Sequence, residues 1–380
     1  MNQLYQVVCN KATIAYYEET KQDIEHVLQI FIRCNSGGTT LSYSDLLLSI
    51  ATSQWEKLDA RKAVHQLVDE LNRIGHGLGV TKDFVLKAGL MLTDVSSVGF
   101  KVRNFTHANM KLLEENWEHI RNALIETVQV VTGFGFDTRS IRATSALLPI
   151  AYYLYKIGTP SNFDSHPSFE QDRKAIRGWL VRSILKASGI WGSGLDTLLT
   201  ALRDVIRETE EPHFPVEEMQ RAMAHRGKSL EFSDEEVEDL ADIKISDSRV
   251  FAVLSLIFSF IDFKNNTFHI DHIFPRSHFS RTRLLKEGFE EGFLEELADG
   301  ANRLGNLQIL EEKLNIVKRT QLPFDWLRNP DVFSDAEKRV SYCNLHLLGD
   351  VPQELKSFPI FYETRRSRLR DRIAKLVNTR

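Results

Sequence analysis

Two short apolar runs near the C-terminus do most to limit the fold of this chain. Residues 268–275, Phe-His-Ile-Asp-His-Ile-Phe-Pro, have the composition of a strand that ends in Asp271-His272 and turns at a proline. Residues 304–310, Leu-Gly-Asn-Leu-Gln-Ile-Leu, have that of a second strand, and a helical pattern follows them. The order predicts a compact strand–strand–helix unit late in the chain.

Most of the remaining sequence has apolar residues at helical spacing. Ser233 is a predicted N-cap, because acidic residues follow it in the first turn. Residues 276–303 separate the two strands and are either a substrate-facing loop or a short helical insertion, and their apolar spacing favours the insertion. Helices are predicted at about 57–74, 82–92, 110–131, 146–155, 169–188, 194–208 and 249–260. The expected fold class is mainly α, with a small α+β unit near the C-terminus.

The polar residues of this unit suit the cleavage of phosphodiester bonds. That reaction needs a base to activate water and a cation to offset charge on the phosphate. Neutral imidazole suits the base, so His272 is the candidate. Mg²⁺ or Mn²⁺ prefers oxygen ligands, which Asp271 and Asn315 would supply. An amide both donates and accepts hydrogen bonds, so Asn306 would hold the loop that carries His272.

Each of these residues also has a purely structural interpretation. His272 could be a packed core histidine, Asp271 a turn residue, Asn306 the end of a strand and Asn315 a surface residue. Their combination in one local unit favours the chemical interpretation.

Three neighbouring residues are weaker candidates for the same site. His269 shares a strand face with Asp271, where it either supports the site or is a satisfied, partly buried histidine. Lys318 lies one helical turn after Asn315 and would meet the phosphate, unless it is a solvated lysine. Arg276 is a further candidate for phosphate contact.

The motifs Asp271-His272-Ile273-x-Pro275, Gly305-Asn306-Leu307 and Asn315-x-x-Lys318 resemble the C-terminal nuclease domain of GmrSD-type modification-dependent restriction endonucleases. The resemblance implies the HNH superfamily and its ββα-metal fold. Residues 30–42 and 176–183 also resemble that family, so the similarity spans nearly the whole chain. It implies a nuclease that restricts foreign DNA, such as phage DNA with modified bases.

The N-terminal part of the chain lacks a signature motif that is typical of the family. Residues 30–42 resemble a late motif of its nucleotide-hydrolysing domain, but the Asp-Gly-Gln-Gln-Arg signature that normally precedes this motif does not occur. Arg33, Asn35, Gly37 and Gly38 are therefore interpreted as a nucleotide-site remnant. Hydrolysis of a nucleoside triphosphate is not expected of this chain alone. We expect the C-terminal part of a longer protein, or one subunit of a split enzyme with a separate nucleotide-hydrolysing partner.

Composition and charge exclude some classes of protein. The 380 residues carry a net charge of −4 and have no apolar run long enough to span a membrane. The three cysteines form no CxxC pair, which argues against a structural zinc site. A cytoplasmic protein without membrane partners is expected. A basic cluster that includes Arg365 and Arg366 would contact DNA phosphates, unless it is a solvated helix face.

The sequence therefore predicts a metal-dependent HNH endonuclease that cleaves DNA. The alternative is a non-catalytic or regulatory DNA-binding subunit that depends on a partner, and RNA cleavage is a third possibility. Four units are expected: a remnant of the nucleotide-hydrolysing domain (1–55), a helical domain (56–262), the HNH nuclease unit (263–335) and a basic C-terminal helical segment that packs on the nuclease (336–380).

Overall fold

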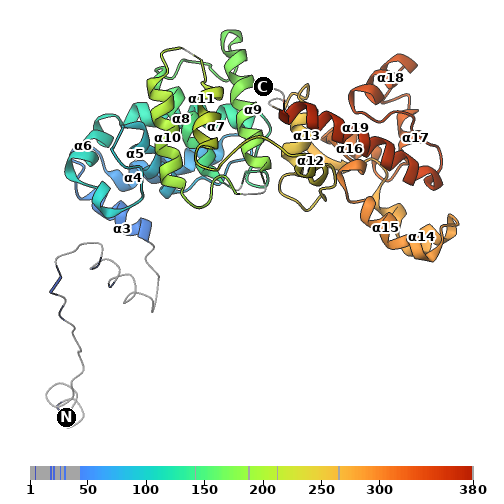
Figure 1. Cartoon of the computed structure of the whole chain (residues 1–380), viewed down its shortest axis with the longest axis horizontal. Coiled ribbons are helices and arrows are strands. Elements are labelled where there is room, and N and C mark those ends of the chain that lie inside the picture. Colours follow the sequence, from blue (N-terminus) through green and yellow to red (C-terminus); the bar gives the residue numbers. More distant parts are fainter. Residues whose placement is uncertain are drawn as a thin grey trace.

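The computed structural model of the chain describes residues 43–378, except 142, 187–188, 212 and 264–265, and a few isolated positions before residue 43. Within these residues the protein is mainly helical and contains a single two-stranded sheet, as the sequence predicts (Figure 1). The remnant residues Arg33, Asn35, Gly37 and Gly38 lie outside the described residues.

The first part of the described chain is a helical assembly. Its α-helices are α3 (Tyr43–Thr52), α4 (Ala60–Arg73), α5 (Lys82–Leu92), α6 (His107–Glu115), α7 (Trp117–Gly133), α8 (Leu148–Lys156), α9 (Glu170–Leu185), α10 (Leu195–Glu208), α11 (Val216–Ala224), α12 (Asp234–Ala241) and α13 (Val250–Ile257). Short 3-10 helices occur at η2 (Val102–Asn104), η3 (Thr144–Leu147) and η4 (Pro167–Phe169).

Local sequence signals account for several helix ends. Ser233 caps α12 as predicted, and it forms a reciprocal capping box with Glu236. The single helix predicted over 110–131 is wrong, because α6 ends and α7 begins at Asn116. The Asn116 amide donates to the Leu112 carbonyl and accepts from the Tyr155 hydroxyl, so it satisfies backbone and tertiary partners at this break.

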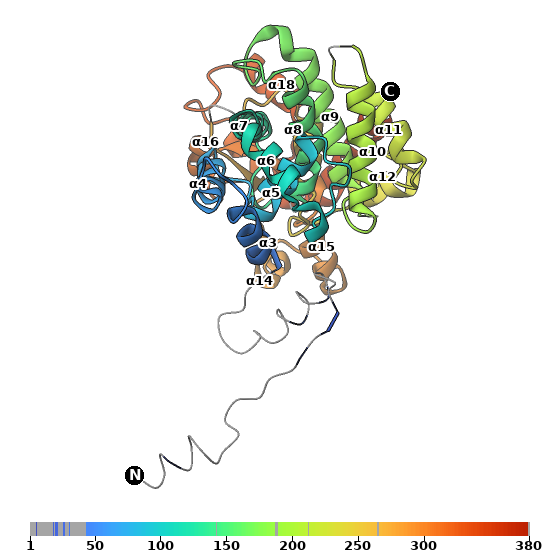
Figure 2. The ribbon, with the colours of Figure 1, turned by 90° about the vertical axis from the view of Figure 1, so that its left-hand side faces the viewer.

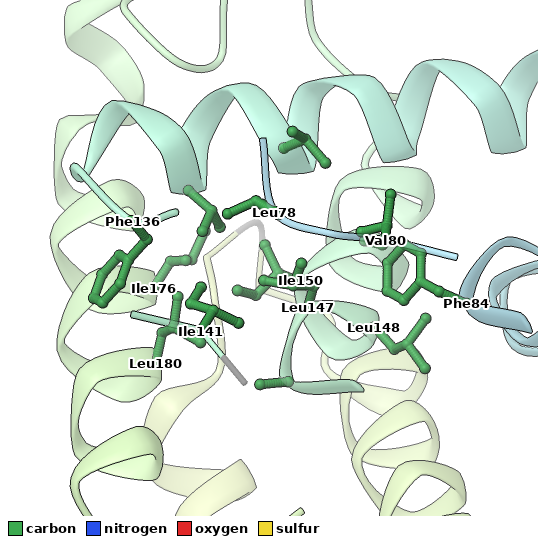
Figure 3. Packing of buried hydrophobic residues seen from close by; sticks show 14 of the residues in the cluster. Leu78, Val80, Phe84, Phe136, Ile141, Leu147, Leu148, Ile150, Ile176 and Leu180 are labelled. Carbon is green, nitrogen blue, oxygen red and sulfur yellow. The ribbon is translucent and has the colours of Figure 1, made fainter. Parts of the chain in front are cut away.

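A large apolar core holds these helices together. Figure 3 shows part of it, where Phe136 and Ile141 lie against Ile176 and Leu180 of α9. The same cluster continues into the C-terminal part of the chain, through Leu304, Leu307 and Ile309 and through Leu369, Ile373 and Val377. Burial of apolar surface on this scale dominates the stability of a domain.

The C-terminal part contains the sheet and the helices around it. Strands β1 (Phe268–His272) and β2 (Leu307–Glu311) pair antiparallel, with Asp271 opposite Gln308 and His272 opposite Leu307. Helix α16 (Glu312–Lys318) follows β2 directly and packs against both strands. The order strand, strand, helix is therefore present. The remaining elements are η5 (Arg276–Phe279), α14 (Arg281–Lys286), η6 (Glu291–Phe293), α15 (Leu294–Gly300), η7 (Leu304–Asn306), α17 (Pro323–Leu327), α18 (Ala336–Leu345), η8 (Leu355–Ser357) and α19 (Phe358–Asn378).

The segment between the strands is a helical insertion. Leu284, Leu294 and Leu297 are buried in a second apolar cluster with Phe274 and Phe279. Leu285 and Phe293 of the same segment are exposed. The helical character of the insertion is confirmed, and only part of its apolar surface packs.

Helix α19 runs between the region of α12 and α13 and that of α17 (Figure 1). It contacts α12, α13 and η7, and η7 directly precedes β2. Helices α14 and α15 lie on one side of the molecule and α18 on the other, as both views show (Figures 1 and 2). Among the described residues, no helix combines the length and the apolar character that a membrane crossing requires.

Candidate functional site

The strand end at Asp271 and His272 brings most of the predicted site residues together. Successive side chains of a strand point to opposite faces, so Asp271 and His272 leave β1 in different directions. Asp271 faces Gln308 across the sheet. Asp271 also contacts Lys318 of α16, and Gln308 contacts Tyr342 of α18. His272 faces the turn that precedes η7.

The Asp271 carboxylate is held by two donors on one of its oxygens. Gln308 Nε2 lies 3.0 Å from Oδ2, and Lys318 Nζ lies 2.9 Å from the same atom. The Gln308 amide is oriented in turn by the Tyr342 hydroxyl, 3.1 Å from Oε1. Oδ1 accepts no hydrogen bond from the described residues.

Lys318 is a buried residue, with 1% of its side chain exposed. Besides the Asp271 carboxylate, its ammonium group contacts the main-chain carbonyl of His272 at 2.6 Å. Burial lowers the pKa of Lys318, and Asp271 opposes that effect. The contact with DNA phosphate expected of Lys318 does not fit this position, because the ammonium group is enclosed by the protein.

The His272 imidazole is partly buried and hydrogen-bonded. Its Nε2 lies 3.2 Å from Oδ1 of Asn302. Burial lowers the pKa of His272 below its ordinary value, and the Asn302 hydrogen bond and the Asp271 charge only partly oppose this. A depressed pKa keeps the ring neutral near neutral pH, which a general base requires.

Asn306 is fully buried beside the segment that follows His272. Its Oδ1 accepts from the Phe274 amide at 2.9 Å, and its Nδ2 donates to the carbonyls of Phe274 at 3.0 Å and Ala301 at 2.8 Å. Its own carbonyl accepts from the Ile273 amide. Asn306 thus ties the chain after His272 to the entrance of β2.

Asn315 lies on α16, one turn before Lys318 and on the same helix face. Its side chain is half-buried and makes no hydrogen bond with the part of the chain that the structure describes. Within that part, no three His, Cys, Asp or Glu side chains gather into a metal-holding group. The predicted ligands, one carboxylate and one amide, do not require such a group.

Two peripheral candidates differ in position. His269 contacts Glu312 of α16, with Nε2 3.8 Å from Oε1, rather than Asp271. Arg276 follows the strand end in η5 and is exposed. Its positive charge acts to lower the pKa of His272, so it lies within electrostatic reach of the imidazole.

The two arginines of α19 lie elsewhere. Arg365 is fully buried and donates to the carbonyls of Leu304, Gly305, Leu307 and His346. A guanidinium with this burial and these partners braces the entrance to β2, so the predicted phosphate contact of Arg365 is wrong. Arg366 forms ion pairs with Asp242 and Glu238 of the α12 region, so its charge is already matched.

Three residues of the site were not predicted from the sequence. Gln308 carried a signal, because it is the polar position in an apolar strand and faces Asp271 once the register is known. Asn302 and Tyr342 come from the insertion and from α18, and sequence spacing does not place either beside the strand end.

No protein-family model and no curated protein matches the chain. The function is therefore proposed from the residues and geometry of this site, together with the resemblance of its motifs to GmrSD-type endonucleases.

Proposed function

We propose that this chain is a metal-dependent HNH endonuclease that hydrolyses phosphodiester bonds in foreign DNA, including phage DNA with modified bases. The observation that supports this most is the position of Asp271-His272 at the end of an antiparallel strand pair, with α16 packed on both strands. Around these two residues, Asn306 and Lys318 fix the backbone.

The donor set suits a hard divalent cation such as Mg²⁺ or Mn²⁺. Oδ1 of Asp271 and the amide oxygen of Asn315 are free of protein hydrogen bonds among the described residues, and both are oxygen ligands. A hard cation keeps several waters, so two protein oxygens are enough. When bound, the cation offsets negative charge on the phosphate and on the leaving oxygen.

The side chains of this site divide the remaining work. The neutral His272 imidazole takes a proton from a water molecule as the water oxygen attacks phosphorus. The bond from phosphorus to the 3′ oxygen breaks, and that oxygen leaves with the electron pair and takes up a proton from solvent. Arg276 contacts the phosphate backbone at the strand end. Lys318 keeps Asp271 and the His272 carbonyl in place.

The test is cleavage of plasmid and phage DNA by purified protein, with Mg²⁺ or Mn²⁺ and with EDTA. We expect cutting that depends on the metal and that falls about 10²- to 10⁴-fold in His272→Ala, the range for loss of a general base. The matched control is His225→Ala, which removes an exposed imidazole after α11 and leaves the site intact. It should cut like the parent protein.

Other results would change the conclusion in defined ways. Equal cutting by the His272→Ala and parent proteins would remove His272 from the base role. Cleavage of RNA but not of DNA would mean that RNA is the substrate. No cutting on any modified or unmodified DNA would favour a regulatory DNA-binding subunit that needs a nucleotide-hydrolysing partner.

A further inference from the structure

Asn302 is the side chain that holds the His272 imidazole. It lies in the turn between α15 and η7, with Oδ1 3.2 Å from His272 Nε2. Its Nδ2 donates to the Ala298 carbonyl at 2.9 Å. One side chain thus links the imidazole at the end of β1 to the backbone of the insertion.

The Ala298 contact determines which way the Asn302 amide faces. A carbonyl oxygen only accepts hydrogen bonds, so the NH₂ group of Asn302 must face Ala298. Oδ1 then faces the imidazole and can only accept. His272 Nε2 must therefore carry the hydrogen, and in the neutral ring the lone pair is on Nδ1.

The backbone around Asn302 is fixed to the helical assembly. The Ile245 amide donates to the Asn302 carbonyl at 2.8 Å, and the Leu304 amide donates to the Ile243 carbonyl at 2.9 Å. Lys244 and Arg303 form an isolated antiparallel bridge between these hydrogen bonds. The turn is therefore a short ladder against residues 243–245, which holds Asn302 in position.

We infer that Asn302 is a positioning residue that keeps His272 in the tautomer protonated at Nε2, and that Nδ1 is the nitrogen that accepts the proton of water. The catalytic half of this inference rests on the proposed nuclease function, whereas the tautomer can be tested without it. Side chains that orient the histidine ligands of metal sites act in a similar way, and their loss costs about 10- to 100-fold in metal affinity or activity.

The first readout is the nitrogen spectrum of histidine-labelled protein at a pH where imidazole is neutral. The His272 signals are assigned as those missing in His272→Ala. We expect the parent protein to show hydrogen on Nε2 alone. Asn302→Ala should show a mixture of tautomers, because no acceptor remains. Asn302→Asp should restore the single tautomer, because a carboxylate oxygen still accepts from Nε2.

The second readout is cleavage kinetics in the same variants. Asn302→Ala should lower kcat about 10- to 100-fold with little change in KM, and Asn302→Asp should recover most of the loss. Asn344→Ala, at an exposed asparagine on α18, is the matched control and should behave like the parent protein. Thermal unfolding of each variant shows whether a loss of activity comes from loss of the fold.

The outcomes separate this inference from the proposed function. Hydrogen on Nδ1 in the parent protein would overturn it, and so would an unchanged tautomer and kcat in Asn302→Ala. A parent protein that cuts no nucleic acid but shows the Nε2 tautomer, lost in Asn302→Ala, would support the positioning role and refute the nuclease.

Discussion

Lys318 combines a buried charge with two contacts at the strand end. Its ammonium group pairs with Asp271 and also contacts the His272 carbonyl, while 1% of the side chain is exposed. Lys318→Met keeps the approximate volume but leaves a largely buried carboxylate without its positive partner and a carbonyl without the Lys318 donor. Breaking a buried pair from one side costs about 3 kcal/mol or more, so the free energy of unfolding should fall by about that amount in urea denaturation.

Two further variants separate the charge from the packing. Lys318→Met combined with Asp271→Asn should regain part of the lost stability, because the uncompensated charge is gone. Lys313→Met, at an exposed lysine on the same helix, should change stability by less than about 0.5 kcal/mol. Equal losses at Lys313 and Lys318 would contradict the buried pair.

The residues of the site were predictable to different degrees. Asp271 and His272 are neighbours in the chain, so their shared position at the strand end follows from sequence. Arg365 appeared to belong to a basic surface, yet it shares a helix face with Phe358, Tyr362, Leu369 and Ile373 at intervals of three and four residues. That spacing could have revealed its burial. Tyr342 reaches Gln308 from a distant helix, and only the tertiary structure brings them together.

Among the elements, η7 directly precedes β2 and determines where this strand begins. It contains Gly305, and a Cβ atom there would lie 2.5 Å from Cε2 and 2.7 Å from Cδ2 of Tyr362. The Tyr362 ring is buried against Phe358, so it has little room to move. Gly305→Ala should therefore lower the free energy of unfolding by about 1–3 kcal/mol, as overpacking does.

Gly178 in α9 is the matched control for this close approach. Apart from its chain neighbours and the backbone of its own helix, no atom of the described residues lies within 4 Å of a Cβ built there, and the residue is inside a helix. Gly178→Ala should leave stability unchanged or raise it by up to about 1 kcal/mol. Thermal or urea unfolding of both variants measures the difference. A Gly305→Ala protein as stable as Gly178→Ala would mean that α19 does not press on η7.

The elements themselves were more predictable than their ends and their packing. Apolar periodicity predicted α5 and α10 to within one residue, and α4 to within three, because each has a continuous stripe of buried side chains. It did not predict the break at Asn116, where side-chain hydrogen bonds replace helical ones. Periodicity detects a buried face, whereas a break of this kind depends on partners distant in sequence.

For the whole molecule, α19 determines whether the two apolar clusters unfold together. Leu369, Ile373 and Val377 lie in the large core with the helical assembly. Phe358, Phe361 and Tyr362 of the same helix lie in the second cluster with the insertion and α17. One continuous helix therefore shares its side chains between both clusters, and β2 does the same through Ile309 and Leu310.

Leu369→Ala tests this coupling, because Leu369 is fully buried where α19 enters the large core. The cavity should cost about 2–5 kcal/mol. Amide hydrogen exchange, followed by mass spectrometry, should then speed up both in α13 and in α17, since the helix that joins them is weakened. Ile360→Ala, at a residue that is 75% exposed on the same helix, should leave exchange nearly unchanged. Faster exchange confined to α13 would mean that the two clusters open independently.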